Sequence, residues 1–201
     1  MTKILSRRTL FVVVLIGCVF YVSFFAHQQS LKNNPSSLIA NASLISGEGK
    51  INSPLPVHLK IPTLNIDAAI EDVGLTPDGA MDVPKGPANV AWFNLGPRPG
   101  EIGSSVIDGH SGYKDNKPAV FDNLYKLKKG DKISIEDENG TTFTFVVREF
   151  KSYGRNENAS DIFSSNDGIA HLNLITCAGD WNAIDKTHSS RLVVFTNREI
   201  E

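Results

Sequence analysis

The chain has 201 residues, of which 41% are hydrophobic and 21% are charged, and its formal net charge at pH 7 is −2. The balance of 20 basic against 22 acidic side chains, with no basic run, argues against a nucleic-acid-binding domain. Its two cysteines do not make a disulfide framework, because Cys18 lies inside an apolar N-terminal segment.

The first element in chain order is an uncharged, apolar stretch over residues 9–26, which follows three basic residues. As a helix it spans about 27 Å, at the short end of what crosses a bilayer. A cleaved signal peptide is the competing interpretation. A signal peptide needs small residues at its last and third-last positions, and if Ala26 is the last residue removed, the third-last is the bulky Phe24. We therefore expect a transmembrane signal-anchor, with residues 1–8 in the cytoplasm because basic residues favour the inner side.

Residues 27–55 have the composition of a linker. They are rich in Ser and Asn, include Pro35 and Pro54, and show no sustained helical or strand period. We expect a flexible extracellular linker. A short docking helix around residues 37–46 is the alternative.

Residues 56–201 are numerous enough for one domain with its own core, and their pattern is mainly β. Val, Ile, Phe and Thr gather in runs that are separated by Gly, Pro, Asn and Asp. The predicted strands are 57–61, 68–75, 104–110, 132–136, 142–153, 170–177 and 191–197. The predicted short helical turns are 88–93, 119–124 and 161–164.

The spacing of these elements restricts the architecture. Glu138-Asn139-Gly140 is typical of a hairpin turn, and it joins the predicted strands 132–136 and 142–153. Short strands at regular intervals favour a closed barrel or a sandwich.

Three residues at strand ends carry the candidate chemistry. Cys177 closes the run 170–177 and is either a small buried residue or a nucleophile. A thiol nucleophile needs a proton partner, and His110 ends the run 104–110. Arg191 opens the last run, where a permanent positive charge can hold a substrate carbonyl or an oxyanion. Taken singly, each has an ordinary structural interpretation as a core thiol, a surface histidine and a solvated arginine.

Other candidates are weaker. His171 lies about 20 Å from Cys177 along the same predicted strand, which is too far to activate the thiol. His188 lies in a polar segment just before Arg191 and is a minor rival to His110. Asp108 shares strand parity with His110, so it either orients the imidazole or simply ends the strand.

Together, the Gly-His pair, the cysteine strand and the arginine strand resemble the sortases, which are membrane-anchored cysteine transpeptidases of bacterial cell surfaces. The sortase signature around the nucleophile is Thr-Leu-x-Thr-Cys. Leu174, Thr176 and Cys177 match it, and Asn173 replaces the first Thr. The resemblance extends over residues 56–201 and is greatest to class F, with classes D and E as near neighbours. Its segments are 61–68, 74–84, 92–93, 96–100, 109–110, 119–124 and 129–131.

The resemblance implies a closed, eight-stranded sortase-type β-barrel, so the prediction above lacks one strand. It implies Cys177 as nucleophile, His110 as acid/base and Arg191 as the group that stabilises substrate and oxyanion, with Thr176 as a second substrate-binding residue. The implied reaction cleaves a Leu-Pro-x-Thr-Gly-like (LPXTG-like) sorting signal between Thr and Gly. The acyl group then passes to an amine of a peptidoglycan precursor.

No cofactor is expected. Some sortases bind calcium, but the acidic residues 136–138 are more typical of a solvated turn, so no metal is expected either. Two other functions stay open: a hydrolytic cysteine peptidase of the same fold, and an inactive, membrane-tethered β-domain that binds peptides. In each case we expect a single-pass protein of the cell membrane with residues 56–201 outside the cell.

Overall fold

The computed structural model describes residues 54–112, 118–184 and 187–200. The predicted anchor at 9–26 lies outside the described residues, as does almost all of the predicted linker at 27–55. Within the described part of the chain, no helix is both long enough and apolar enough to cross a membrane.

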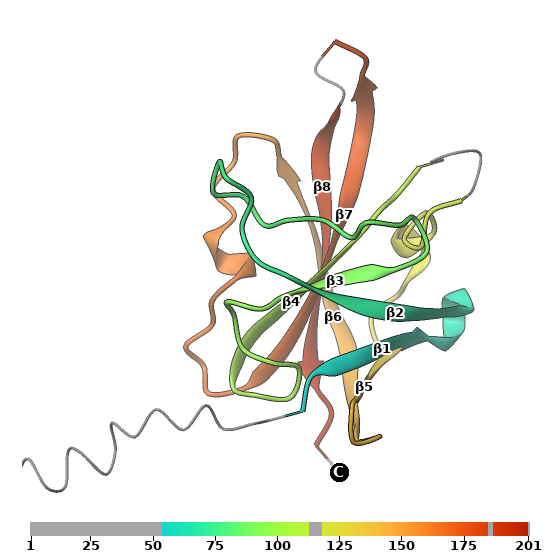
Figure 1. The fold of residues 1–201 in the computed structure, drawn as a ribbon, viewed down its shortest axis with the longest axis vertical. Coiled ribbons are helices and arrows are strands. Elements are labelled where there is room, and N and C mark those ends of the chain that lie inside the picture. The colour runs from blue at the N-terminus through green and yellow to red at the C-terminus, as the bar shows by residue number, and fades with distance from the viewer. Residues whose placement is uncertain (1–53, 113–117, 185–186, 201) are drawn as a thin grey trace, which may run out of the picture. The chain divides into compact units, whose positions relative to one another are not determined.

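Eight strands close into a barrel in the order β1-β2-β3-β4-β7-β8-β6-β5 (Figure 1). The strands are β1 (Pro56–Ile61), β2 (Ile66–Val73), β3 (Val90–Phe93), β4 (Gly103–Gly109), β5 (Lys132–Asp137), β6 (Thr142–Gly154), β7 (Ala170–Asn182) and β8 (Thr187–Arg198). The pairs β2–β3 and β4–β7 are parallel and the remaining pairs are antiparallel. This confirms the mainly β, closed eight-stranded barrel.

Alternating burial explains why the strands close around one interior. In β1 the side chains of Leu59 and Ile61 are fully buried, and in β5 those of Ile133 and Ile135 are fully buried. Their neighbours in the sequence are more exposed, as expected for strands with one face toward a core. The barrel interior is therefore filled by apolar side chains.

A second apolar cluster lies on the outer face of β4, β7 and β8. It contains Val106, Tyr153, Ile162, Ile175, Val193 and Phe195. Ile162 comes from η3 (Ser160–Ile162), a 3-10 turn in the connection between β6 and β7. That connection covers part of the outer face, which is why β7 is buried on both sides from Ala170 to Thr176. The candidate catalytic residues lie farther along this same face.

The helical turn predicted at residues 88–93 is wrong, because this segment contains strand β3 (Val90–Phe93). Val90, Ala91 and Trp92 are all buried, so the strand faces apolar surroundings on both sides and shows no alternation. It pairs in parallel with β2 and antiparallel with β4, and it supplies the missing eighth strand.

The other predicted connections are close to those observed. The predicted turn at 161–164 overlaps η3, and the one at 119–124 ends where η2 (Leu124–Lys126) begins. The β5–β6 hairpin is confirmed, with Gly140 at the positive φ of 79° that its turn requires. β7 and β8 run beyond their predicted ends as a hairpin that projects from the barrel (Figure 1).

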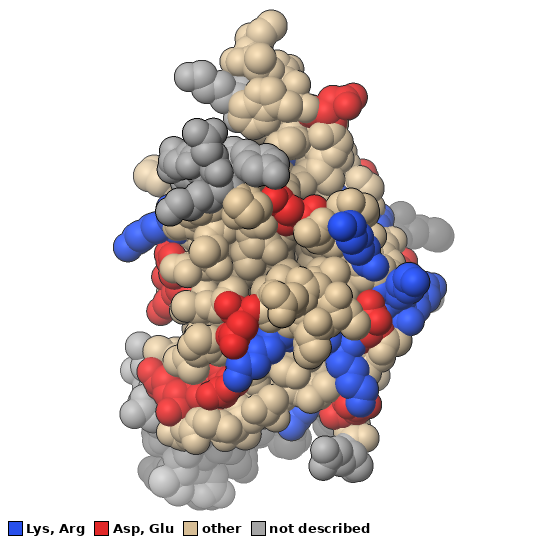
Figure 2. Space-filling model, turned by 90° about the vertical axis from the view of Figure 1, so that its right-hand side faces the viewer, with Lys and Arg blue, Asp and Glu red and all other residues tan. Residues whose placement is uncertain are grey.

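The charges on the surface are mixed. On the face shown in Figure 2, Lys and Arg side chains alternate with Asp and Glu, and the described residues visible there form no extended patch of one sign. Lys60 pairs with Glu136 at 2.7 Å and Lys132 pairs with Glu199 at 2.7 Å. This face has no electrostatic footprint for nucleic acid.

Candidate active site

Cys177 and Arg191 are direct cross-strand partners. The antiparallel register of β7 and β8 places Cys177 opposite Arg191, and the register of β6 and β8 places Tyr153 on the other side of Arg191. Side chains of directly opposed residues share one face of a sheet. The thiol and the guanidinium group therefore project from the same outer face of the barrel, although 13 residues lie between them in the sequence.

His110 is held beside Cys177 by hydrogen bonds on both of its flanks. Before it, the carbonyl of Gly109 accepts a hydrogen bond from Thr176 Oγ1 at 2.7 Å. After it, Ser111 Oγ donates to the carbonyl of Cys177 at 2.6 Å. The parallel register of β4 and β7 pairs Asp108 with Ile175. His110 follows Asp108 by two residues and Cys177 follows Ile175 by two residues, so the two lie side by side. The structure thus brings all three predicted catalytic residues close together, with His110 just past the end of β4 and Cys177 and Arg191 within β7 and β8.

Gly109 is required by close packing under this site. A Cβ atom at Gly109 would overlap the ring of Phe121, which is itself buried. The Phe121 N–H also donates to the carbonyl of His110 at 2.9 Å. The Gly-His pair in the sequence therefore has a physical basis. Glycine lets β4 approach the ring of Phe121, and the backbone N–H of Phe121 then fixes the backbone of His110.

The His110 ring makes a contact that selects its tautomer. Its Nε2 lies 2.8 Å from the carbonyl oxygen of Pro84, in the connection between β2 and β3. A carbonyl oxygen only accepts hydrogen bonds, so Nε2 carries the proton. Nδ1 is then the nitrogen that can exchange a proton with a thiol.

The Cys177 thiol is half-buried. Burial raises its pKa, the Arg191 charge opposes that rise, and the Asp108 carboxylate adds to it. Cys177 is therefore mainly a thiol at neutral pH, and a nearby base has to take its proton before the sulfur can act as a nucleophile.

Asp108 is the second ionisable group with a perturbed pKa on this face. Burial raises the pKa of its carboxyl to about 7, although the nearby Arg191 charge and a hydrogen bond from the Gly109 N–H favour the charged form. A carboxyl whose pKa lies near neutrality, within a pocket beside an arginine, is a feature of functional sites. The sequence drew attention to Asp108 through its parity with His110, but its pocket position depends on β7 and β8 being its neighbours.

A pocket of about 270 Å³ opens beside these residues, and we call it the Arg191 pocket. Its floor is formed by Asp108, Ile175 and Arg191. One wall comes from residues 80–83 of the β2–β3 connection and the other from Ile162 and Phe163 of the β6–β7 connection. Its lining is mostly apolar and includes Arg191, the cross-strand partner of Cys177, so it suits an extended peptide with apolar side chains. Residues 80–83 fall in one of the segments that carry the resemblance, but no motif in the sequence marked Ile162 or Phe163.

The remaining sequence candidates lie elsewhere or have other partners. Thr176 is buried and its hydroxyl bonds to Gly109, so its predicted role in substrate binding has no support in this geometry. His188 bonds through Nδ1 to the carbonyl of Gly179 at 3.0 Å and contacts the ring of Trp181. His171 is buried at the start of β7, away from Cys177 as predicted. The described residues contain no group of three His, Cys, Asp or Glu side chains suited to a metal ion.

Comparisons with known proteins agree with this geometry. The family model for the sortase domain matches residues 59–199. Sortase C-1 from Actinomyces oris is 25% identical, with 73% of this chain and 76% of that chain covered and a TM-score of 0.58. A lid mutant of sortase A from Corynebacterium diphtheriae is 23% identical, with coverages of 74% and 72% and a TM-score of 0.57.

Sortase D5 from Clostridium perfringens, a transpeptidase, is 21% identical, with coverages of 73% and 79% and a TM-score of 0.53. At these identities, the last two likenesses show the fold alone. None of the curated proteins searched matches the chain. The sortase domain model nevertheless covers most of the chain, the strands close into a barrel, and a thiol lies beside a histidine and an arginine on the outer face of that barrel. The chain belongs to the sortase family of cysteine transpeptidases.

Proposed function

We propose that this enzyme cleaves an LPXTG-like sorting signal between Thr and Gly and transfers the acyl fragment to an amine of a peptidoglycan precursor. The observation that carries the proposal is the direct pairing of Cys177 with Arg191 on β8, with His110 held on the other side of Cys177 by β4. The apolar part of the Arg191 pocket supports it, because the Leu-Pro portion of such a signal needs an apolar surface.

In the proposed first step, Nδ1 of His110 takes the thiol proton and the Cys177 sulfur attacks the Thr carbonyl carbon. The carbonyl oxygen becomes an oxyanion, and the fixed charge of Arg191 stabilises it. When the C–N bond breaks, the leaving Gly nitrogen receives a proton from the His110 imidazolium. The product of this step is a thioester on Cys177 and a free Gly amine.

In the second step an incoming amine attacks the thioester carbon. His110 removes a proton from that amine, a new amide bond forms, and the sulfur leaves to be reprotonated as the thiol. Water is the competing nucleophile, so a peptidase and a transpeptidase differ only in which of the two reaches the thioester.

The proposal extends to the rest of the chain. Residues 1–8 are cytoplasmic, residues 9–26 form a single membrane anchor, residues 27–55 form a flexible linker, and residues 56–201 form the catalytic domain outside the cell. The basis is the apolar stretch after three basic residues and the polar composition of the linker. The class F assignment rests on the sequence segments given above, since the similar solved structures described above belong to classes A, C and D.

The test is incubation of the full-length chain with a fluorogenic Leu-Pro-x-Thr-Gly peptide library, with and without an added amine. The proposal predicts cleavage after Thr and a new product that contains the amine. Cleavage that yields only the free acid, with the amine at saturating concentration, indicates the hydrolytic peptidase. Peptide binding without cleavage indicates the inactive domain.

A further inference from the structure

The segment of residues 155–169, which we call the β6–β7 loop, forms one wall of the Arg191 pocket. Its residues Ile162 and Phe163 line that pocket, and Ile162 is almost fully buried in the outer apolar cluster. The loop contains only one turn of 3-10 helix, so its own backbone hydrogen bonds do little to hold it against the barrel. The position of the pocket wall therefore depends on side-chain ties to the strands beneath.

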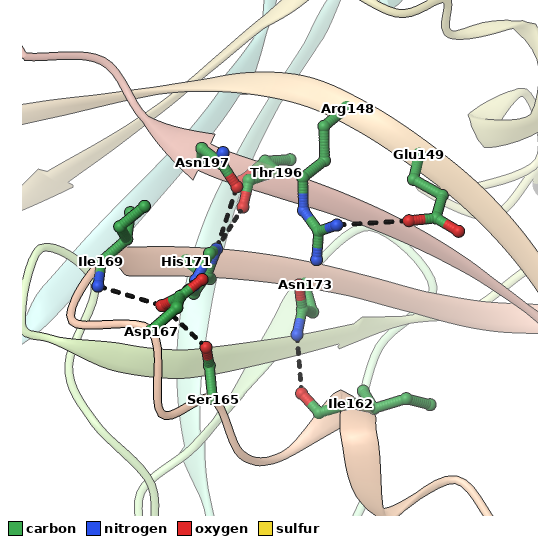
Figure 3. A network of polar contacts seen from close by, with 10 residues as sticks. All are labelled: Arg148, Glu149, Ile162, Ser165, Asp167, Ile169, His171, Asn173, Thr196 and Asn197. Carbon is green, nitrogen blue, oxygen red and sulfur yellow. Dashed lines mark hydrogen bonds and ion pairs between the residues drawn. The ribbon is translucent and has the colours of Figure 1, made fainter.

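The first tie is Asn173, the residue that departs from the sortase signature. Its side chain is buried on the outer face of β7, and Nδ2 donates to the carbonyl of Ile162 at 2.6 Å (Figure 3). Only the NH₂ end of the amide can donate to a carbonyl, so the orientation of the side chain is fixed.

That orientation leaves Asn173 Oδ1 buried and without a hydrogen-bond partner among the described residues. A buried, unpaired oxygen destabilises the folded state, and an apolar residue of similar shape would avoid this cost. The value of asparagine at this position therefore lies in the hydrogen bond to Ile162.

The second tie is His171, two residues earlier on the same face of β7. Its Nε2 lies 3.0 Å from both carboxylate oxygens of Asp167 in the loop. Its Nδ1 faces the carbonyl of Thr196 at 3.1 Å and Oδ1 of Asn197 at 3.0 Å, both on β8 (Figure 3). The buried ring thus connects the loop to β8 through β7.

The Asp167 carboxylate is organised for this contact. Ser165 Oγ and the Ile169 N–H donate to the same carboxylate at 2.9 and 3.0 Å. The hydrogen bond with His171, together with those two, holds the pKa of Asp167 well below its usual range, so the carboxylate keeps its charge at physiological pH.

We propose that Asn173 and His171 are positioning residues that hold the β6–β7 loop against β7 and so fix the wall of the Arg191 pocket that receives substrate. The substrate part of this inference rests on the proposed function; the loop part does not. Neither residue touches the reacting atoms, so their loss weakens substrate binding more than it slows the chemical step.

The test compares Asn173→Leu, which keeps the approximate size but cannot donate, with Thr196→Val as a matched control. Thr196 is also buried, and its Oγ1 donates to the carbonyl of Leu172 at 2.7 Å, which ties β8 to β7 and not to the loop. Valine keeps the backbone carbonyl of this residue, which is the group of Thr196 that faces His171. Amide hydrogen exchange in the full-length chain reports on the loop directly, through the N–H groups of Ile162 and Phe163.

We expect Asn173→Leu to exchange those two amides at least tenfold faster, with β5 amides unchanged, and to raise KM about fivefold to tenfold with kcat within twofold. Thr196→Val should leave the loop amides and KM at their wild-type values. Unchanged loop exchange in Asn173→Leu overturns the proposal, as does a fall in kcat with KM unaltered. If the wild-type chain cleaves no peptide, the proposed function fails and the exchange comparison still decides whether these residues hold the loop.

Asp167→Ala provides a second variant in case Asn173→Leu does not fold, because the Asp167 side chain is half exposed and its removal leaves no cavity. Its control is Asp67→Ala, which breaks an exposed pair with His58 of the same 3.0 Å length on β1 and β2. Faster loop exchange in the Asp167 variant alone supports the proposal. Equal behaviour of the two variants contradicts it.

Discussion

The pairing of Cys177 with Arg191 brings a thiol that must become an anion next to a group that is always a cation. The Arg191 charge counteracts part of the rise in thiol pKa caused by burial, and in the proposed mechanism the same charge stabilises the oxyanion. One residue would then serve both the nucleophile and the transition state. This double role predicts that charge alone does not replace the planar guanidinium group.

Arg191→Lys is expected to lower the rate of acylation by about 10²- to 10³-fold, because lysine keeps the charge but loses the planar set of donors. Single-turnover acylation by a cleavable peptide measures this rate. The control is Arg198→Lys on the same strand, where Arg198 donates to the carbonyl of Gly100 far from the thiol. Wild-type acylation by Arg191→Lys would refute the role assigned to the guanidinium group.

Asp108 predicts a pH dependence of stability. Its folded pKa of about 7 lies above the usual value of 3.8, so the folded state holds the proton more tightly than the unfolded chain does. The contribution of Asp108 to stability should therefore be most favourable at a pH below its usual pKa, and it should be lost as the pH rises from about 4 to about 7. Asp108→Asn removes this loss and should be more stable than wild type at pH 8 by on the order of 4 kcal/mol, since each unit of pKa difference corresponds to about 1.4 kcal/mol.

Urea denaturation at pH 4.5 and pH 8 measures the difference. Asp82→Asn is the control, because Asp82 lines the same pocket but is exposed. If Asp108→Asn and the wild type show the same dependence of unfolding free energy on pH, burial of Asp108 has no energetic effect.

At the scale of elements, the sequence predicts a strand best where one face alone is buried. β5 and β6 show alternating burial and a turn with a glycine at positive φ, and their hairpin was predicted correctly. β3 was missed because its four residues lie between two strands with no exposed face, which leaves no period to detect. The ends of β7 and β8 were missed because Ala178–Asn182 and Thr187–Ser190 are polar, and backbone pairing alone extends them.

The candidate site divides in the same way. His110, Cys177 and Arg191 were predicted because their residue types are chemically distinctive and each lies at the end of an apolar run in the sequence, although β7 and β8 continue past Cys177 and Arg191. The pocket walls and the role of Asn173 could not be predicted, because they depend on which loop lies over which face of β7. That is a property of the closed barrel and of long-range contacts, and no local pattern records it.

The β5–β6 turn gives a test of an element. Asp137 is buried, and its Oδ1 accepts hydrogen bonds from the N–H groups of Asn139 and Thr141 at 2.9 and 2.8 Å. Asp137→Ala leaves both donors unpaired and should lower the free energy of unfolding by about 1–3 kcal/mol.

Thermal or urea unfolding measures this loss. Asn139→Ala keeps the donated N–H and removes only an exposed side chain, so it should change stability by no more than about 0.5 kcal/mol. Equal effects of the two substitutions would mean that the Asp137 side chain does not organise the turn.

At the scale of the whole molecule, the proposed linker at 27–55 predicts where proteases cut. Its polar composition and lack of period leave it without a core of its own, whereas the barrel buries its backbone in strands. Protease treatment of intact cells or spheroplasts should release a folded fragment that begins near residue 50. Resistance along the whole linker, or a fragment obtained only after lysis, would contradict the proposed arrangement outside the membrane.

In the proposed mechanism Cys177 carries the acyl group during turnover. The most direct measurement is tandem mass spectrometry of the full-length chain, quenched in acid during reaction with a Leu-Pro-x-Thr-Gly peptide. We expect an added mass equal to the fragment ending in Thr, located on Cys177 and not on Cys18, and lost when an amine is added. Cys177→Ala should fold normally and show no adduct. Cleavage of the peptide by Cys177→Ala, or an adduct on any other residue, would contradict the account.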